Sequence, residues 1–573
     1  MKTTKMAVEA KNILLRNDGL YIREPGGGKR RLCPPIRVKA VAKVDGTSRH
    51  LAIISYQDRE GNYHKEIVPM SLMQKRHLLK DKLLDGGFPL PSGDDGDAVL
   101  EHLQDTTEVR CITIVLKTGW ISRGAYAFPD EVVGPDRKNY LYQSPYGGTP
   151  ERGSGTRGSL EKWKSSVAVP AEKSAIAIFA IAIAFASMLL RWHKIESGGF
   201  HYYAPNSHGK TTIIMAALSV LYPVAVNGLV HWDATTAGLE QEALRCNDAL
   251  LVLDEMGHLA GEDEKLAATQ AAKISYRLAG GKGRLRSALY DPDGHACEWR
   301  LLFLSSGEMS IANLHAGVAR KRYGGDELRL IDIPASLSEA NGVFDNLGIG
   351  DDSAKLVDSI RTGATTHYGY AGREFLANYM TSFEDADQNV TRWMAKFYAH
   401  VGVEPSGSSG RFASRFALAY AAARLARSYG IVTWSKERIL EAIGLCHAGA
   451  VRTVPDRAAL MEASLNSVRR KLGKATRALD MRNGQKYGAD ELADAAAYLR
   501  RDSEEGDFYA VKPEALEKWL EPGVTLHTFG QEMIARNAVL TQARGLPTKQ
   551  VKIKGLEKKV SYYCLRKSFV VEG

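Results

Sequence analysis

The fold of this chain is decided by the stretch FHYYAPNSHGKTTIIMAALSVL, residues 200–221. It has the pattern of a short apolar strand, a turn and a helix. In that order Gly209 permits a close backbone approach to phosphate, and the first N–H groups of the helix hold phosphate oxygens. Lys210 then reaches the β and γ phosphates of ATP, while Thr211 offers a hydroxyl to Mg²⁺. The predicted nucleotide-binding residues are Asn206, Ser207, His208, Gly209, Lys210, Thr211 and Thr212.

One position departs from the usual pattern of such a loop. Ala204 stands where the consensus begins with Gly, and an alanine meets a left-handed backbone requirement less easily. A Gly-Lys-Thr triplet also occurs by chance, so the prediction depends on the downstream segments of the chain.

A second apolar run, NDALLVLDEMGHL at residues 247–259, ends in two carboxylates. A β-strand that delivers two acids at its C-terminal end suits ATP hydrolysis. Asp254 would hold the hydrated Mg²⁺, and Glu255 would orient and polarise the attacking water. The alternative is a helix start where the dipole favours acidic residues, and the upstream loop favours the catalytic interpretation.

Two later segments supply further candidates for the same site. WRLLFLSSGE (299–308) places Ser305 and Ser306 at the end of another apolar run. Ser306 would sense the γ-phosphate, although serine after a strand is equally typical of a turn. GVARKRYGGDELRLIDIP (317–334) brings Arg320, Arg322 and Arg329 together before a further strand. At least one is expected to reach a neighbouring subunit's γ-phosphate as an arginine finger, the alternative being a solvated basic loop.

A glycine-rich basic segment lies between the acidic strand and the serine strand. Within ISYRLAGGKGRLRSALYD (274–291), the centre GGKGRLR indicates a turn between segments that could pair. A hairpin there would project Lys282, Arg284 and Arg286 into a channel and grip DNA phosphates without sequence preference. A flexible surface loop is the alternative.

Composition sets outer limits on these hypotheses. The 573 residues suffice for two to four domains, and 44% hydrophobic with 25% charged residues excludes global disorder and disulfide-stapled miniproteins. The net charge of +10 permits a polyanionic partner without requiring one. The six cysteines are scattered without zinc spacing, which indicates reduced thiols, a cytoplasmic location and no structural metal.

Only one stretch has the length of a membrane span. The 17 residues from Ser174 to Leu190 carry no charge but run within a few residues into the predicted phosphate loop. A buried helix beside an ATP site explains them better, so no membrane association is expected. The N-terminus also lacks the apolar core of a signal peptide.

Periodicity divides the chain into four parts. Residues 1–165 predict a β-rich, antiparallel domain with a helical insertion near Leu72 to Leu84, and residues 166–365 predict an α/β core with parallel strands. Helices dominate 366–450 as a lid-like region. Residues 451–573 form a basic helical stretch and a small mixed domain whose terminal hairpin is typical of a winged-helix module.

The segments GWISRGAYAFPDEVVG, HWDATTAGLE, ALLVLDEMGHL, YRLAGGKGRLRS, WRLLFLSSGE and ELRLIDIPA resemble the bacterial family catalogued as domain of unknown function 927. Its members are helicase-like ATPases of phages, integrated elements and cassette chromosomes. The resemblance runs from about Leu32 to about Ala450. It implies an AAA+ core related to the superfamily-three and MCM helicases, with a hairpin at Gly280 to Arg286. It also implies a homo-oligomeric ring around DNA, with a hexamer as the expected size.

The sequence therefore predicts an ATP- and Mg²⁺-dependent DNA helicase or translocase of a mobile element, acting largely on single strands and working with other replication proteins of that element. The alternative is an ATP-driven switch or assembly ATPase that recruits partners and never unwinds a duplex. Stimulation of ATP hydrolysis by single-stranded DNA separates the two hypotheses.

Overall fold

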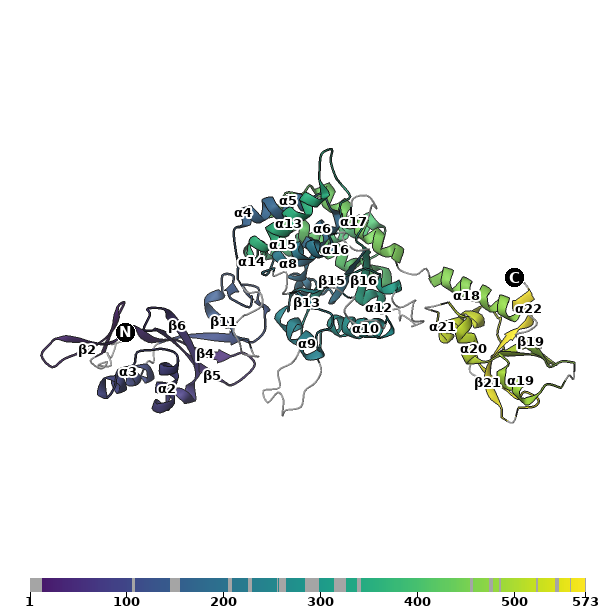
Figure 1. The fold of residues 1–573 in the computed structure, drawn as a ribbon, viewed down its shortest axis with the longest axis horizontal. Helices are drawn as coiled ribbons and strands as arrows, with labels where there is room; N and C mark the ends of the chain where they lie inside the picture. The colour runs from purple at the N-terminus through teal and green to yellow at the C-terminus, as the bar shows by residue number, and fades with distance from the viewer. Residues whose placement is uncertain are drawn as a thin grey trace, which may run out of the picture.

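Three bodies follow one another along the part of the chain that the structure describes (Figure 1). The structure is a computed structural model. It describes residues 13–105, 109–144, 155–204, 209–224, 229–254, 256, 264–283, 298–313, 326–336, 342–453, 457–473, 478–483, 486–521, 524–541, 546–556 and 558–571.

The N-terminal body is built on a sheet of order β11-β7-β4-β5-β6. Its central strand β4 buries every second residue, as the alternation of its sequence requires. The predicted helical insertion is confirmed by α1 and α2, and Leu79 and Leu83 of α2 pack in the core with residues of α3. The elements of this sheet and its helices are β4 (Ile36–Val44), β5 (His50–Gln57), β6 (Tyr63–Pro69), α1 (Met70–Met73), α2 (Arg76–Asp85), α3 (Asp94–Gln104), β7 (Arg110–Val115), η1 (Arg137–Asn139) and β11 (Tyr140–Tyr142).

The antiparallel prediction for this region is correct for β4, β5 and β6 but wrong for β7 and β11. Both of these strands run parallel to their neighbours. The crossover through α1, α2 and α3 brings the chain back to the β4 edge, so β7 runs parallel to β4. The residues between β7 and β11 form a second crossover, so β11 runs parallel to β7. Two small antiparallel sheets accompany this sheet: β1 (Ile13–Arg16), β2 (Gly19–Arg23) and β3 (Lys29–Cys33), and then β8 (Gly119–Ser122), β9 (Ala125–Ala127) and β10 (Val132–Val133).

The central body contains a wholly parallel sheet of order β13-β14-β15-β12-β16. Its strands are near-continuous apolar runs, because helices cover both faces and leave no polar side. The chain order differs from the spatial order, so β15 lies between β12 and β14. The strands and helices of this part are α4 (Leu160–Trp163), η2 (Lys164–Ala168), α5 (Val169–Ala171), α6 (Ala175–Ser187), α7 (Leu190–His193), β12 (Gly198–Tyr203), α8 (Lys210–Ser219), β13 (Val230–His231), α9 (Thr236–Arg245), β14 (Ala249–Asp254), α10 (Glu264–Gly280), β15 (Leu301–Gly307), α12 (Asp326–Arg329) and β16 (Leu330–Pro334).

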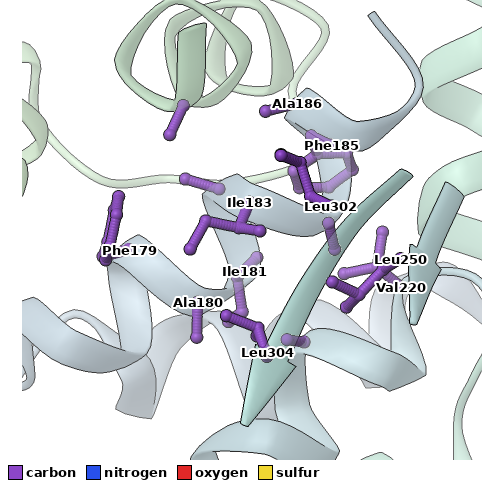
Figure 2. Packing of buried hydrophobic residues seen from close by; sticks show 14 of the residues in the cluster. Phe179, Ala180, Ile181, Ile183, Phe185, Ala186, Val220, Leu250, Leu302 and Leu304 are labelled. Atoms are coloured by element: carbon purple, nitrogen blue, oxygen red, sulfur yellow. The ribbon is translucent and has the colours of Figure 1, made fainter. Parts of the chain in front are cut away.

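The apolar stretch that has the length of a membrane span is the buried helix α6, as predicted. All of its residues are buried, and Figure 2 shows Ile181 of this helix close to Leu304 of the sheet. Its 13 residues span about 20 Å, short of the roughly 30 Å hydrocarbon core of a bilayer. Across the described residues, no helix combines the length and apolarity needed to cross a membrane.

A set of longer helices completes the central body. Helices α16 and α17 pack against α6, and α13 packs against the helix α8 that begins at Lys210. Stacked rings of Phe179 and Phe416, 5.0 Å between centroids, join α6 to α16. These helices are α13 (Ser353–Thr366), α14 (Tyr370–Thr381), α15 (Phe383–Val401), α16 (Gly407–Ser428) and α17 (Lys436–Thr453).

The C-terminal body has a sheet of order β17-β18-β19-β21-β20 with an apolar core on each face. Alternate residues of β21 pack in the two cores: Tyr563 and Leu565 lie in one, and Tyr562 and Cys564 lie in the other. Its elements are α18 (Arg457–Leu472), β17 (Ala478–Asp480), α19 (Ala489–Asp494), β18 (Ala497–Asp502), β19 (Gly506–Val511), α20 (Pro513–Trp519), α21 (Leu526–Ala535), β20 (Lys549–Val551), β21 (Val560–Arg566) and α22 (Lys567–Val571).

Candidate active site

The predicted strand, turn and helix around Gly209 are present in the structure. Strand β12 ends at Tyr203 and α8 begins at Lys210, with Gly209 as the residue before the helix. Gly209 has φ +83°, a left-handed conformation that side chains disfavour, and an added Cβ would lie 3.3 Å from Val357 and 3.4 Å from Val343. Glycine is therefore required here by both conformation and space. The predicted residues Asn206, Ser207 and His208 lie outside the described residues.

Ala204 accommodates the loop without backbone strain. In the described part of the chain, the non-glycine residues with positive φ are Lys194, Asp248 and Asn537, so Ala204 needs no left-handed conformation. Its carbonyl oxygen accepts a hydrogen bond of 2.6 Å from the Lys210 Nζ. The backbone of this buried alanine thus helps to position the lysine.

Lys210 is half-buried among acidic groups. Burial lowers the pKa of its ammonium below the usual value, and the carboxylates of Glu308 and Asp254 oppose that shift. Glu308 follows β15, and the sequence interpretation assigned it no role. The segment 299–308 contained it, but nothing in its own pattern indicated that it would lie near a lysine almost one hundred positions earlier.

Strand register brings Asp254 and Ser306 together. Leu253 of β14 pairs with Ser305 of β15, so the next residues, Asp254 and Ser306, are neighbours at the carboxyl ends of both strands. The Ser306 hydroxyl donates a 2.6 Å hydrogen bond to Asp254 Oδ1. Lys210, Asp254 and Ser306 therefore meet at one edge of the sheet, while Glu255 lies outside the described residues.

The two threonines after Lys210 have different surroundings. Thr211 is exposed in the first turn of α8, whereas Thr212 is buried in the core. A hydroxyl and a carboxylate are hard oxygen ligands, so Thr211 and Asp254 fit Mg²⁺ better than a softer metal. Within the described residues no cluster of three or more His, Cys, Asp or Glu side chains forms a metal site. A Mg²⁺ ion that shares its ligands with phosphates needs no such cluster.

Ser305, adjacent to Ser306, belongs to a buried hydrogen-bond chain behind the site. Its Oγ accepts from Trp232 Nε1 at 2.9 Å and lies 2.9 Å from His201 Nδ1. His201 Nε2 lies 3.0 Å from the Met309 carbonyl, which can only accept, so Nε2 carries the proton and Nδ1 accepts from the serine. These bonds join β12, β15 and the residues after β13, and sequence analysis missed both His201 and Trp232.

Of the three predicted arginines, the structure describes Arg329, while Arg320 and Arg322 lie outside the described residues. The Arg329 guanidinium stacks on the Tyr276 ring, 4.2 Å from its centroid. Leu330 pairs with Gly199 near the start of β12, whereas Gly209 and Lys210 follow the other end of that strand. Four residues of strand separate the two ends, about 13 Å. Arg329 therefore lies away from Gly209 and Lys210 of the same chain.

The structure describes the hairpin predicted at Gly280 to Arg286 only as far as residue 283. Helix α10 continues to Gly280, and the pair that closes the loop joins Lys282 to Glu298. The segment ISYRLAG continues the helix, so the expectation that it could pair as a strand is wrong. Lys282 is exposed at the base of the loop and forms a 3.0 Å ion pair with Glu298. Arg284 and Arg286 lie outside the described residues.

A buried acid connects the N-terminal segment to the base of the central sheet. Asp248 precedes β14, and its carboxylate accepts from the Trp120 backbone N–H at 3.2 Å and from Arg300 Nε at 3.1 Å. Burial raises the pKa of Asp248, and Arg300 opposes that shift. The Tyr126 hydroxyl donates to the Asp248 carbonyl at 2.9 Å. Residues around β8 and β9 are thereby held against the strand that ends in Asp254.

Comparisons with known proteins agree with this architecture. Residues 7–291 match the family described as Domain of unknown function (DUF927), which confirms the family resemblance predicted from the sequence. A comparison with curated proteins gives no match. A solved structure described as "SCCmec type IV Cch - active helicase" matches with a TM-score of 0.63 and 16% identity, over 98% of this chain and 99% of that chain. At that identity the similarity establishes a shared fold.

Proposed function

From the match of residues 7–291 to the family described as Domain of unknown function (DUF927), and from the site geometry, we propose that the protein is an ATP-dependent DNA helicase or translocase of a mobile element. One observation carries the proposal: Lys210, Asp254 and Ser306, from three separate segments, converge at the carboxyl edge of a parallel sheet. That edge is where open α/β sheets bind their ligands. The same fold in a protein described as an active helicase supports it.

Each residue of the site has a distinct task in this proposal. Lys210 and the first N–H groups of α8 bind the β and γ phosphates, and Gly209 allows their close approach. Thr211 and Asp254 supply oxygen ligands to Mg²⁺, which when bound neutralises charge on the phosphates. Ser306 holds Asp254 through its 2.6 Å hydrogen bond. Glu255, next in sequence, orients and polarises the attacking water.

An AAA+ type of motor is favoured by the insertion of β15 between β12 and β14. This insertion places the polar end of β15, with Ser306 and Glu308, between the phosphate loop and Asp254. Arg329 lies about 13 Å along the strand from the loop of its own chain, so it would complete the site of a neighbouring subunit. The proposal therefore includes a ring of subunits, with a hexamer as the expected size, around DNA.

Strand displacement on a forked duplex tests this function. Wild type should unwind the fork in the presence of ATP and Mg²⁺, and Lys210→Ala should lose both ATP hydrolysis and unwinding, because the phosphates lose their main cationic partner. Lys436→Ala removes an exposed lysine at the start of α17 and should retain both activities.

The alternative, an ATP-driven switch, predicts a different result in this experiment. A switch would hydrolyse ATP without stimulation by single-stranded DNA and would leave the fork intact. Such a result for the wild type, with hydrolysis still abolished in Lys210→Ala, would reject the helicase and retain the ATPase.

A further inference from the structure

The C-terminal body contains a helix pair and a strand pair that the ATPase site does not use. Helices α20 (Pro513–Trp519) and α21 (Leu526–Ala535) share one apolar core through Leu516, Trp519, Phe529 and Met533. Thr525 caps α21 by accepting from the Thr528 N–H at 3.0 Å, so the second helix has a defined start.

Helix α21 is fixed beside the strands β20 and β21. The Tyr563 hydroxyl of β21 donates to the Leu526 carbonyl at 3.2 Å. Gly530, in the middle of α21, lies so close to Pro547 that an added Cβ would be 2.8 Å from the proline ring. The first turns of α21 and the strand pair therefore form one rigid unit.

The outer face of α21 has an exposed stripe without acids, lysines or arginines. His527, Gln531 and Ala535 are exposed at four-residue spacing, so they lie on one side of the helix, opposite the buried Phe529 and Met533. The nearby Arg536 is held by Glu532 and Glu462 and adds little free positive charge to that stripe.

The connection between β20 and β21 is basic. Residues 552–559 carry four exposed lysines, Lys552, Lys554, Lys558 and Lys559. Ile553 is buried in the core, and Arg500 donates to the Lys552 carbonyl at 2.9 Å, so the base of this basic arm is anchored. Because its base is fixed, the arm loses little conformational entropy when its ammonium groups bind a polyanion.

We propose that the C-terminal body is a duplex-DNA-binding module in which α21 enters the major groove and the basic arm, residues 552–559, grips the adjacent phosphates. The major groove of B-form DNA admits an α-helix, and a glutamine one turn from a histidine can contact base edges there. The lysines match the phosphate charge and carry no sequence information. This proposal rests on the proposed function only in naming DNA as the polymer.

Duplex binding by the full-length chain tests the module apart from the motor. The probe is a blunt duplex of about 40 base pairs, roughly four helical turns, measured without nucleotide from about 50 to 200 mM salt. Replacing Lys552, Lys554, Lys558 and Lys559 by Ala should lower the magnitude of the log K against log salt slope by about 0.9 per lost contact, up to about 3.6. The matching Lys→Arg variant should restore the slope.

A matched control separates local contact from overall charge. Lys39, Lys43, Lys65 and Lys80 are exposed lysines of the N-terminal body, and replacing them by Ala removes the same charge. The duplex slope should then stay at the wild-type value. An equal drop in this control, or an unchanged slope in the arm variant, would overturn the proposal.

Two further probes test the groove assignment. Duplex RNA of the same sequence has a deep, narrow major groove, so it should bind at least about tenfold more weakly than DNA. His527→Ala with Gln531→Ala should keep the salt slope but lower discrimination among a randomised duplex pool about tenfold per lost base contact. Equal binding of duplex RNA, or a pool without enrichment in the wild type, would each contradict it.

Failure of this proposal is distinguishable from failure of the proposed function. Lys210→Ala should bind the blunt duplex with the wild-type slope although it hydrolyses no ATP. The arm variant should hydrolyse ATP normally in the absence of DNA. Loss of DNA-independent hydrolysis in the arm variant would count against a separate module.

Discussion

The carboxyl edge of the central sheet and the basic arm of the C-terminal body, both proposed to bind phosphate, differ in how their lysines are placed. At the sheet edge Lys210 is half-buried, held by the Ala204 carbonyl and close to Asp254 and Glu308. On the arm, four lysines stand exposed on one short connection. A partly desolvated site acts as a unit, so single changes there have large effects, whereas exposed charges act additively and are screened by salt. Variants of the two regions should therefore differ widely in the size of their effects.

The largest effect is expected from the arginines that would act between subunits. Replacing Arg320, Arg322 and Arg329 singly by Ala should give one variant that binds ATP and assembles normally but hydrolyses it about 10³-fold more slowly or worse. Mixing that variant with Lys210→Ala should restore part of the activity, since each supplies what the other lacks at a shared interface. Steady-state hydrolysis across mixing ratios measures this, and absence of any rescue would argue for a site completed within one chain.

A similar but somewhat smaller loss is expected at the acid that follows Asp254. Glu255→Gln should keep nucleotide affinity, because the amide still fits beside Mg²⁺, while turnover falls by about 10² to 10⁴-fold since it cannot polarise water. Equilibrium nucleotide binding and hydrolysis measured on the same preparation check this. Turnover equal to the wild type would remove Glu255 from the mechanism.

Ser306 and Ser305 are expected to differ in role, because Ser306 bonds to Asp254 whereas Ser305 bonds to buried side chains behind the site. Ser306→Ala removes the donor to Asp254 and should slow turnover on the order of tenfold with little change in stability. Ser305→Ala removes the buried hydrogen bonds of Ser305 with Trp232 and His201 and should cost about 1–3 kcal/mol of stability. Thermal unfolding and ATP hydrolysis are measured for both variants. Equal losses of stability and of turnover in the two variants would contradict the separation of roles.

Acid should destabilise the helical part of the central body through His447. Burial among the rings of Phe397, Phe412 and Phe416 lowers its pKa from 6.5 to about 4. As the pH falls, the unfolded chain therefore binds the proton at a higher pH than the folded chain does. The stabilisation that comes from burying neutral His447 is complete above about pH 6.5 and is lost as pH falls towards about 4. The loss is on the order of 2 kcal/mol after allowance for partial screening. Between pH 7 and pH 5, the free energy of unfolding should fall less in His447→Phe than in the wild type.

The smallest effect on the fold is expected at the loop base. Lys282 and Glu298 form an exposed pair, so Lys282→Ala should change stability by less than about 1 kcal/mol. If the loop contacts DNA, Lys282→Ala with Arg284→Ala should lower the single-strand salt slope by about 0.7 per lost contact and abolish unwinding, while DNA-independent hydrolysis persists. A double variant that binds and unwinds like the wild type would identify this segment as a surface loop.

Local pattern allowed much of the central body to be predicted. The glycine at 209, the lysine after it and the acids at the end of an apolar run indicate a phosphate loop and its metal-binding strand, because each motif is confined to a few consecutive residues. The length and position of the apolar stretch at 174–190 likewise predict a buried helix, and α6 has that structure. Short-range signals of this kind do not depend on which elements become neighbours.

The sequence by itself thus determined the strand, the loop, the helix and the acidic strand end. Only the tertiary structure decided that β15 lies between β12 and β14, that Ser306 bonds to Asp254 while Ser305 bonds elsewhere, and that Glu308 lies near Lys210. It also decided that β7 and β11 run parallel to their neighbours and that Lys282 pairs with Glu298. The physical reason is that strand order, register and ion pairing join residues far apart in the chain. Those pairings are selected by packing of the whole core and not by any local sequence preference.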